Sequence, residues 1–290
     1  ASRGQALVES AALASRQILW NWDAFEAGAG EEAIHQMRVA LRRLRVALKT
    51  FRAEQSETAW RYVAEEAKAL GNTVGELRDL DVLACDIVAP LEAVPEKPDL
   101  AALRALLQES RHSTRRALVE TLVAPRWVEF RSKLALWPMQ IEQQLEQEHA
   151  KVYDRSARKA GYKSLERLWK RIDQAAGDAD ALDIERRHAL RKDLRRLRYA
   201  VELVAPLAGD ADAGRMITEI RRLQYSLGHL NDVATAHRLA EMPVIRNHTD
   251  AAVQRAIGFV IGWHAAKAQD SWRETTESLA RLRRMPRFWD

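Results

Sequence analysis

The chain has 290 residues, with 46 Lys and Arg against 41 Asp and Glu, which gives a formal net charge of +5. Its single cysteine, Cys85, excludes an intramolecular disulfide, and no stretch approaches the ~20 apolar residues that a membrane-spanning helix needs. Only 12 Gly and 8 Pro interrupt a sequence rich in Ala, Leu, Arg and Glu, which favours long helices over a β fold. These features predict an all-α protein of the cytoplasm.

The chain begins Ala1-Ser2-Arg3-Gly4, without an initiator Met and without the charged-then-apolar order of a secretory signal. We therefore expect it to be part of a longer chain with a further domain upstream. Its length allows two units, because a single core rarely grows beyond about 250–300 residues.

The first strong signal along the chain is a row of basic residues on a predicted helix. The row follows a 3-4-3-4-3 spacing and consists of His35, Arg38, Arg42, Arg45, Lys49 and Arg52. At about 100° per residue these side chains lie within roughly 100° of arc, beside an apolar seam that includes Leu41, Leu44 and Leu48. At about 1.5 Å per residue the row is ~25 Å long. Since it contains no acidic residue, it predicts a groove for an extended anion rather than a mixed, solvated face.

A partner helix follows, on which Lys68, Asn72, Gly75 and Asp79 share one face. Gly75 indicates a close approach between helices. The expected role of Asp79 is to orient an Arg of the basic row. A loop broken by prolines follows at positions 90, 95 and 98, and Trp137-Pro138 predicts the end of a helix.

The pattern H-x-x-R-x-x-L-R-R-L-R at residues 35 to 45 recurs at residues 188 to 198, an offset of 153 positions (188 − 35). The same offset places Leu70, Gly75, Leu77 and Asp79 on Leu223, Gly228, Leu230 and Asp232. Two motifs that keep one register indicate an internal duplication. We predict two pseudo-symmetric helical bundles, residues 1–140 and 141–290, around a basic central pore or groove.

The second basic row consists of His188, Arg191, Arg195 and Arg198, and Arg221 occupies the position on the partner helix that corresponds to Lys68. Glu202 stands where the first copy has Lys49, so the second row is shorter and is expected to bind an anion more weakly. Gly228, like Gly75, is expected to allow a close approach between helices.

Both basic patterns, together with the run Leu-Arg-Asp-Leu-Asp-Val at residues 77 to 82, resemble the CHAD domain, the conserved histidine α-helical domain. The resemblance includes the Arg-rich residues 111 to 131 and the ending from Gly258 to Trp289, and so covers nearly the whole chain. The second half departs from the acidic motif, because it reads Leu-Asn-Asp-Val-Ala-Thr at residues 230 to 235.

The resemblance implies two helical bundles whose basic centre binds inorganic polyphosphate without cleaving it. The contact residues that it implies are His35, Arg38, Arg42, Arg45, His188, Arg191, Arg195 and Arg198. It further implies an upstream CYTH-type triphosphatase domain as a partner and a location on polyphosphate granules. The Glu-x-Glu-x-Lys signature of such a triphosphatase is not found in this sequence.

Three alternatives compete with this interpretation. Glu32-x-x-His35 and Glu185-x-x-His188 provide half of a di-iron site, but the other half is missing, because Glu65 corresponds to Thr218. A phosphohydrolase would need a P-loop, a metal dyad or a nucleophile motif, none of which we find. Single-strand nucleic-acid binders alternate cations with aromatic rings, which both basic rows lack. We therefore predict a binding module for long-chain polyphosphate, with no catalytic residue, no metal and no cofactor.

Overall fold

A computed structural model describes residues 1–51, 58–148, 155–208, 211–269 and 271–290. In chain order the helices are α1 (Arg3–Glu26), α2 (Glu31–Phe51), α3 (Thr58–Thr73), α4 (Gly75–Asp81), the π-helical segment η1 (Val82–Val88), the 3-10 segment η2 (Ala89–Ala93), α5 (Ala101–Leu122), α6 (Pro125–Glu148), α7 (Ala157–Gly177), the 3-10 segment η3 (Ala179–Ala181), α8 (Ile184–Ala208), α9 (Ala211–Glu241), α10 (Pro243–Arg246), α11 (Ala251–Ala268) and α12 (Ser271–Arg284). Within the described ranges, β pairing is limited to an isolated bridge between Ser2 and Ser156. The all-α prediction is confirmed. No helix in these ranges is both long enough and apolar enough to cross a membrane.

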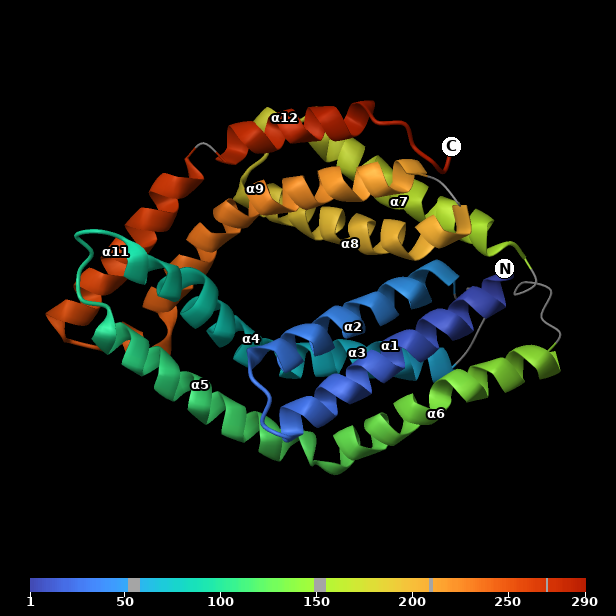
Figure 1. Cartoon of the computed structure of the whole chain (residues 1–290), viewed down its shortest axis with the longest axis horizontal. Helices are drawn as coiled ribbons and strands as arrows, with labels where there is room; N and C mark the ends of the chain where they lie inside the picture. Colours follow the sequence, from blue (N-terminus) through green and yellow to red (C-terminus); the bar gives the residue numbers. More distant parts are fainter. Residues whose placement is uncertain (52–57, 149–154, 209–210, 270) are drawn as a thin grey trace.

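The helices form two layers that face each other (Figure 1). The lower layer contains α1, α2, α3 and α6, and the upper layer contains α7, α8, α9 and α12. At the left end of the view α11 lies beside one end of α5, α5 runs along the lower edge towards α6, and α4 lies nearer the middle. Helix α2 contacts both α7 and α8, so the two layers meet along the helix that carries the first basic row.

Local sequence explains how the first layer forms. Ser2 caps α1 by accepting a hydrogen bond from the Gln5 backbone N–H at 3.2 Å, while the Gln5 side chain accepts one from the Ser2 N–H at 2.9 Å. Helix α1 packs along α2, and Trp22 and Phe25 are buried there with the apolar seam of α2. This packing fixes the rotation of α2 about its axis and turns its basic row towards the second layer.

Three apolar clusters stabilise the molecule. The first is built mainly from α1, α2, α3 and α6, and the second from α7, α8, α9, α12 and the C-terminal residues. The third joins residues from both sides of residue 140, for example Leu83 and Ile87 of η1 with Leu239 of α9. The two layers therefore share a core at one end.

The helix bounds follow the offset found in the sequence. Helix α8 begins 153 residues after α2 (184 − 31), and α9 begins 153 residues after α3 (211 − 58). The duplication and the division into residues 1–140 and 141–290 stay predictions. Residue 140 itself lies within α6.

The predicted helix end at Trp137-Pro138 is wrong, because α6 continues through Pro138 to Glu148. Proline removes one backbone hydrogen bond and costs roughly 3 kcal/mol in a helix interior. Phe130, Leu134, Trp137 and Ile141 are all buried on one face of α6, and their burial offsets that cost. The expected loop is confirmed at positions 95 and 98, whereas Pro90 lies within the 3-10 segment η2.

Candidate functional site: basic cavities between the two layers

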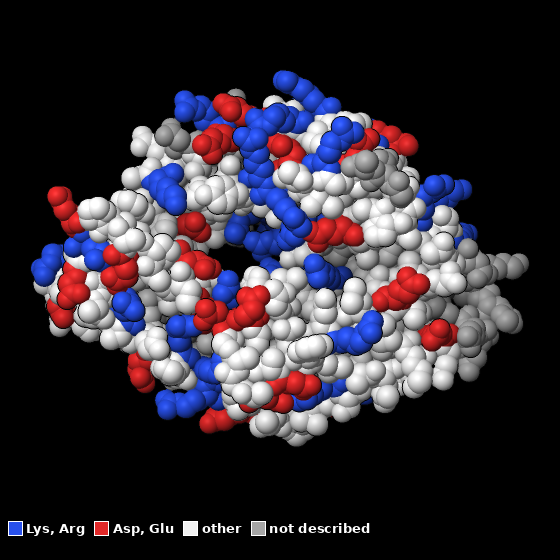
Figure 2. Space-filling model, in the orientation of Figure 1, with Lys and Arg blue, Asp and Glu red and all other residues white. Residues whose placement is uncertain are grey.

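A cavity of about 580 Å³ lies between the layers, and both basic rows line it. Figure 2 shows a hollow near the middle of the molecule with Lys and Arg side chains at its margin. The predicted residues that line this central cavity are His35, Arg38 and Arg42 of α2 and His188, Arg191, Arg195 and Arg198 of α8. Seven of the predicted contact residues, which are distant in sequence, thus converge on one space.

Arg38 reaches the cavity through space that Gly75 leaves open. Its Nη1 donates a hydrogen bond to the Gly71 carbonyl at 3.3 Å. A Cβ atom at Gly75 would lie 2.6 Å from Arg38 Nη1, which is closer than real contacts allow. The expected close approach at Gly75 is therefore real, but it serves the Arg38 side chain. The same expectation at Gly228 is wrong, since nothing lies within 4 Å of a Cβ built there.

Arg191 is held by a chain of hydrogen bonds that crosses from α9 to α4. Its Nη1 donates to Asn231 Oδ1 at 2.8 Å, and Asn231 Nδ2 donates to Thr235 Oγ1 at 3.1 Å. Arg238 donates to Thr235 Oγ1 at 3.3 Å and to Asp79 Oδ2 at 3.0 Å. Asp79 therefore pairs with Arg238 of α9. Burial lowers the pKa of Arg38, and the charge of Asp79 opposes that shift. That Asp79 orients an Arg of the basic row stays a prediction.

Tyr199 lies at the meeting point of the two rows. Its ring is 5% exposed. The Arg198 guanidinium is 4.5 Å from the ring centroid and that of Arg42 is 6.0 Å away, so cations from both layers approach the same aromatic ring. This contact holds two like charges close together at the centre of the site.

Burial and mutual repulsion make the cations of this cavity easier to deprotonate than in water. Burial, followed by the charges of Arg191 and Arg42, lowers the pKa of Arg195 to about 10. The pKa of His35 is lowered by burial and then by Arg78, and that of His188 by burial and then by Lys192. Burial is the first cause of each shift, and neighbouring positive charges add to it.

The described carboxylates compensate only some of these cations. Glu202 Oε1 accepts a hydrogen bond from Arg198 at 2.8 Å, and Arg78 pairs with Asp86 at 3.3 Å. The cations for which the described residues provide no ion-pair partner are His35, Arg38, Arg42, His188, Arg191 and Arg195. The Nε of Arg42 is buried and has no hydrogen-bond partner among the described atoms. Six unpaired cations from two helices thus face one cavity.

A second cavity, of about 380 Å³, continues from the first. Arg42, Arg195 and Tyr199 line both cavities. The cations of this second cavity are Arg42, Arg45 and Lys49 of α2, Arg167 and Arg171 of α7, and Lys192, Arg195 and Arg196 of α8. Arg45 and Lys49 were predicted as parts of one row with His35, and the structure places them here.

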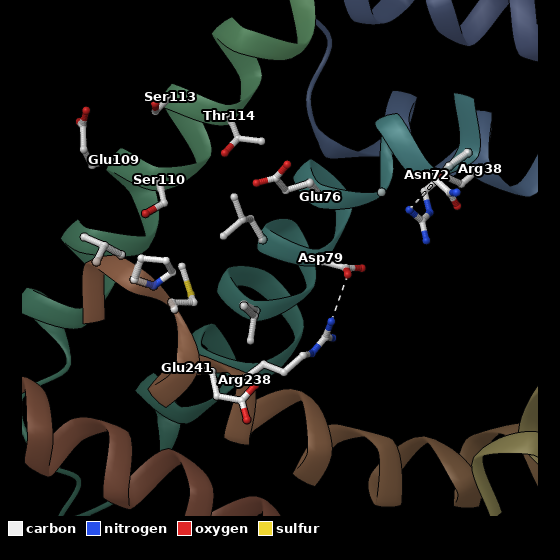
Figure 3. A pocket seen from close by; sticks show the side chains of 17 residues that line it. Arg38, Asn72, Glu76, Asp79, Glu109, Ser110, Ser113, Thr114, Arg238 and Glu241 are labelled. Carbon is white, nitrogen blue, oxygen red and sulfur yellow. Dashed lines mark hydrogen bonds and ion pairs between the residues drawn. The ribbon is translucent and has the colours of Figure 1, made fainter. Parts of the chain in front are cut away.

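On its other side the central cavity adjoins a pocket of about 940 Å³ with a different charge (Figure 3). Arg38, Asp79 and Arg238 line both spaces. Glu76 and Asp79 of α4, Glu109 of α5 and Glu241 of α9 give this pocket an acidic lining, and hydroxyl groups of α5 face it. The Asp79–Arg238 ion pair marks the boundary between the basic cavity and the acidic pocket.

Two predicted site residues, Lys68 and Arg221, are not brought to these cavities. Lys68 is exposed on α3. Arg221 is exposed on α9, where its Nη2 lies 3.5 Å from Glu202 Oε1. Asn72, Gly75 and Asp79, which were predicted to share a face with Lys68, do line one pocket. Arg52 lies outside the described residues.

Sequence reasoning missed several residues that line the two basic cavities. In the central cavity these include Arg78, Asn231 and Arg238, and in the second they include Arg167, Arg171, Lys192 and Arg196. Arg78 lies inside the motif at residues 77 to 82, which was a usable signal. The pairs at 167 and 171 and at 192 and 196 each have a four-residue spacing, which places both members on one face.

The described residues contain no group of three or more His, Cys, Asp or Glu side chains arranged to hold a metal ion. Asp232 lines the central cavity, where burial raises its pKa and His264 and His229 lower it. Its near neighbour is His229, whose Nδ1 lies 3.8 Å from Asp232 Oδ2.

Together the fold and the site define an all-α protein with an Arg-rich cavity between two helical layers. The family model of the CHAD domain matches residues 10–241. The chain belongs to the CHAD family, whose members are in general non-catalytic binding domains with an affinity for polyphosphate.

Solved structures and a curated relative agree with this assignment. The crystal structure of the CHAD domain from the plant Ricinus communis is similar with a TM-score of 0.81 and 27% identity, over 99% of this chain and 94% of that one. PptA from Streptomyces chartreusis shares the fold, with a TM-score of 0.66 and 15% identity over 97% of this chain and 100% of that one. An uncharacterized protein of Mycobacterium tuberculosis is 28% identical over 235 residues, 78% of this chain. The match spans 43% of that relative's length.

Proposed function

We propose that this protein binds long-chain inorganic polyphosphate, without cleaving it, in the central cavity between its two layers. The observation that carries the proposal is the set of six cations that face this cavity and for which the described residues form no ion pair, although Asp79 and Asp232 also line it. Arg guanidinium groups match the oxygens of phosphate groups, and a partly buried site strengthens each such contact. The general affinity of CHAD domains for polyphosphate supports the same ligand.

Contacts from both layers favour a chain over a single phosphate. His35 and Arg42 of α2 are separated by seven residues, or about 10 Å along the helix. His188 and Arg195 of α8 have the same spacing on the opposite wall. A linear polyanion can engage such groups in succession, and each additional contact is made without a further loss of translational freedom.

The lining gives little support to a nucleic-acid ligand. Bases bind single-strand sites by stacking on accessible aromatic rings. The aromatic ring in the described lining of both basic cavities is Tyr199, which is almost fully buried and faces two guanidinium groups. We therefore keep polyphosphate as the partner and nucleic acid as the competing outcome of the test.

The proposal is tested with the double substitution Arg38→Glu and Arg191→Glu, one from each layer. We expect polyphosphate binding to be lost while the helical content and melting temperature change little, because both side chains reach solvent in the cavity. Retained binding in a folded double variant would refute this site. Competition with single-stranded RNA at fixed salt distinguishes the two polyanions, and phosphate release in the presence of Mg²⁺ would reveal a phosphohydrolase.

As further parts of this proposal, we place the protein in the cytoplasm at polyphosphate granules and expect a CYTH-type triphosphatase domain as a partner. Sedimentation with polyphosphate granules and co-purification with such a domain test these two expectations separately from binding.

A further inference from the structure

The second basic cavity differs from an ordinary charged surface in the balance of its charges. Its lining has eight cations, and Asp193 is the acid nearest to them. Asp193 accepts hydrogen bonds from Arg171 at 3.0 Å and from Arg196 at 2.8 Å, so a single carboxylate serves two guanidinium groups. Among the described residues, Arg45, Lys49, Arg167 and Lys192 have no ion-pair partner.

Several arginines elsewhere on the described surface have their own acids. Arg126 pairs with Glu66 at 2.8 Å, and Arg283 pairs with Asp173 at 2.7 Å. Four of the eight cations that line the second cavity lack such a pair, so positive charge is in excess in the space between α2, α7 and α8. The pKa of Lys49 is lowered first by burial and then by the positive charges of Arg171, Arg196 and Arg167.

The cavity is also a formed space with a defined floor. Thr50 Oγ1 of α2 and Ser164 Oγ of α7 lie 3.3 Å apart in a hydrogen bond beneath it, and both side chains are buried. Its wall is continuous with that of the central cavity through Arg42, Arg195 and Tyr199. An anionic chain bound in the central cavity can therefore extend into it without leaving a basic surface.

The opposite direction is unfavourable for an anion. There the central cavity meets the Asp79–Arg238 ion pair and then the acidic pocket that contains Glu76, Glu109 and Glu241 (Figure 3). Like charges would repel a polyanion at this end. The surroundings of the central cavity are thus acidic at the α4–α5 end and basic at the α7 end.

We propose that the cavity between α2, α7 and α8 is an extension site, which binds the part of a long polyphosphate chain that protrudes from the central cavity. This proposal rests on the proposed function. It makes Arg167 and Lys49 determinants of chain-length preference: short polyphosphates use the central cavity, and long ones use both.

The test compares long-chain polyphosphate with tripolyphosphate, using the double variant Lys49→Gln and Arg167→Gln. Both residues are exposed. They line the extension site but neither of the other two cavities. We expect the affinity for the long chain to fall about tenfold, as for the loss of charged contacts, and that for tripolyphosphate to change less than about twofold. The charge-preserving double variant Lys49→Arg with Arg167→Lys should keep the long-chain affinity of the native protein, which would confirm that the charge at these two positions matters.

The matched control is Arg16→Gln with Arg255→Gln, which removes the same charge from exposed positions on α1 and α11 that line none of the three cavities. Equal losses in control and test variant would attribute the effect to net charge and overturn the proposal. So would an unchanged ratio of long-chain to tripolyphosphate affinity. Thermal melting checks the fold, and if the double variant unfolds, Lys49→Gln alone must lower the same ratio.

The two proposals fail in different ways. If the native protein binds no polyphosphate, the proposed function itself is wrong. If it binds, and Arg38→Glu with Arg191→Glu abolishes binding while the Lys49 and Arg167 variant leaves chain-length preference intact, only the extension site is wrong.

Discussion

Gly75→Ala tests the central cavity without removing any charge. An added Cβ would lie 2.6 Å from Arg38 Nη1 and 3.8 Å from its Cζ, so the guanidinium must move. The hydrogen bond from Arg38 to the Gly71 carbonyl, 3.3 Å long, is then lost or rearranged. Arg38 would still carry its charge, but it would no longer be held in the position from which it faces His35 and Arg42.

The magnitude follows from the contacts involved. A hydrogen bond to a charged group contributes about 1.5–3 kcal/mol, and a flexible guanidinium recovers part of this by finding a new position. We therefore expect a loss of about 1.4 kcal/mol in binding, or about tenfold in Kd. The fold should not suffer, because the atoms displaced are the end of a long side chain and Ala favours helix over Gly by about 0.5–1 kcal/mol.

Gly228→Ala is the matched control, since it is the corresponding position in the second half and nothing lies within 4 Å of the added Cβ. Titration calorimetry with long-chain polyphosphate and thermal melting should be run on both variants. Gly75→Ala should weaken binding with an unchanged or higher melting temperature, whereas Gly228→Ala should leave the Kd unchanged. Wild-type affinity of Gly75→Ala would show that the position of Arg38 is unimportant and would refute the reasoning.

Two further predictions concern the charges of the central cavity. Arg195→Gln should weaken binding more than Arg198→Gln, about tenfold against about threefold, because Glu202 already neutralises Arg198 and no described carboxylate pairs with Arg195; equal losses in titrations of the two variants would contradict this. Polyphosphate affinity should rise as the pH falls, because protonated His35 and His188 attract the anion. Burial lowers both pKa values in the free protein below 6.5, and a bound polyanion raises them, so the gain lies between the pKa of the complex and the lower pKa of the free protein. His35→Gln with His188→Gln should remove this pH dependence in titrations from pH 8 to pH 5, and an unchanged slope would assign the slope to other groups.

The parts of the site that could be predicted lie on a single helix each. The spacing of His35, Arg38 and Arg42 places them on one face of α2, and the apolar seam of α2 determines where that face points. Both features can be read from the sequence of a single helix. The same reasoning applies to Arg191 and Arg195 of α8. For these residues the sequence contains both the helical spacing of the basic side chains and the side of the helix on which they lie. A basic pore or groove was expected from them.

The parts that could not be predicted depend on packing between helices. Asp79 and Arg238 are 159 residues apart, and nothing in either neighbourhood indicates their ion pair. Arg167 and Arg171 lie on a helix whose basic residues are spread around it, so the face that meets α2 is set only by tertiary contacts. Lys68 shares the predicted helical face of Gly75, but it is exposed and lines none of the three cavities, because the cavities reach only part of that face.

The fold can hold so many like charges together because its apolar clusters lie behind them and not between them. Leu41, Leu44 and Leu48 anchor α2 in the first cluster, and burial of each contributes about 1.5–3 kcal/mol. Two unit charges about 4 Å apart near a protein surface repel each other by about 4 kcal/mol. The repulsion between the rows of α2 and α8 acts between the layers, whereas each layer keeps its own apolar cluster. The third cluster and the Asp79–Arg238 pair hold the layers together at the acidic end. Under the proposed function, an anion that enters from the basic end would relieve the remaining repulsion between the layers.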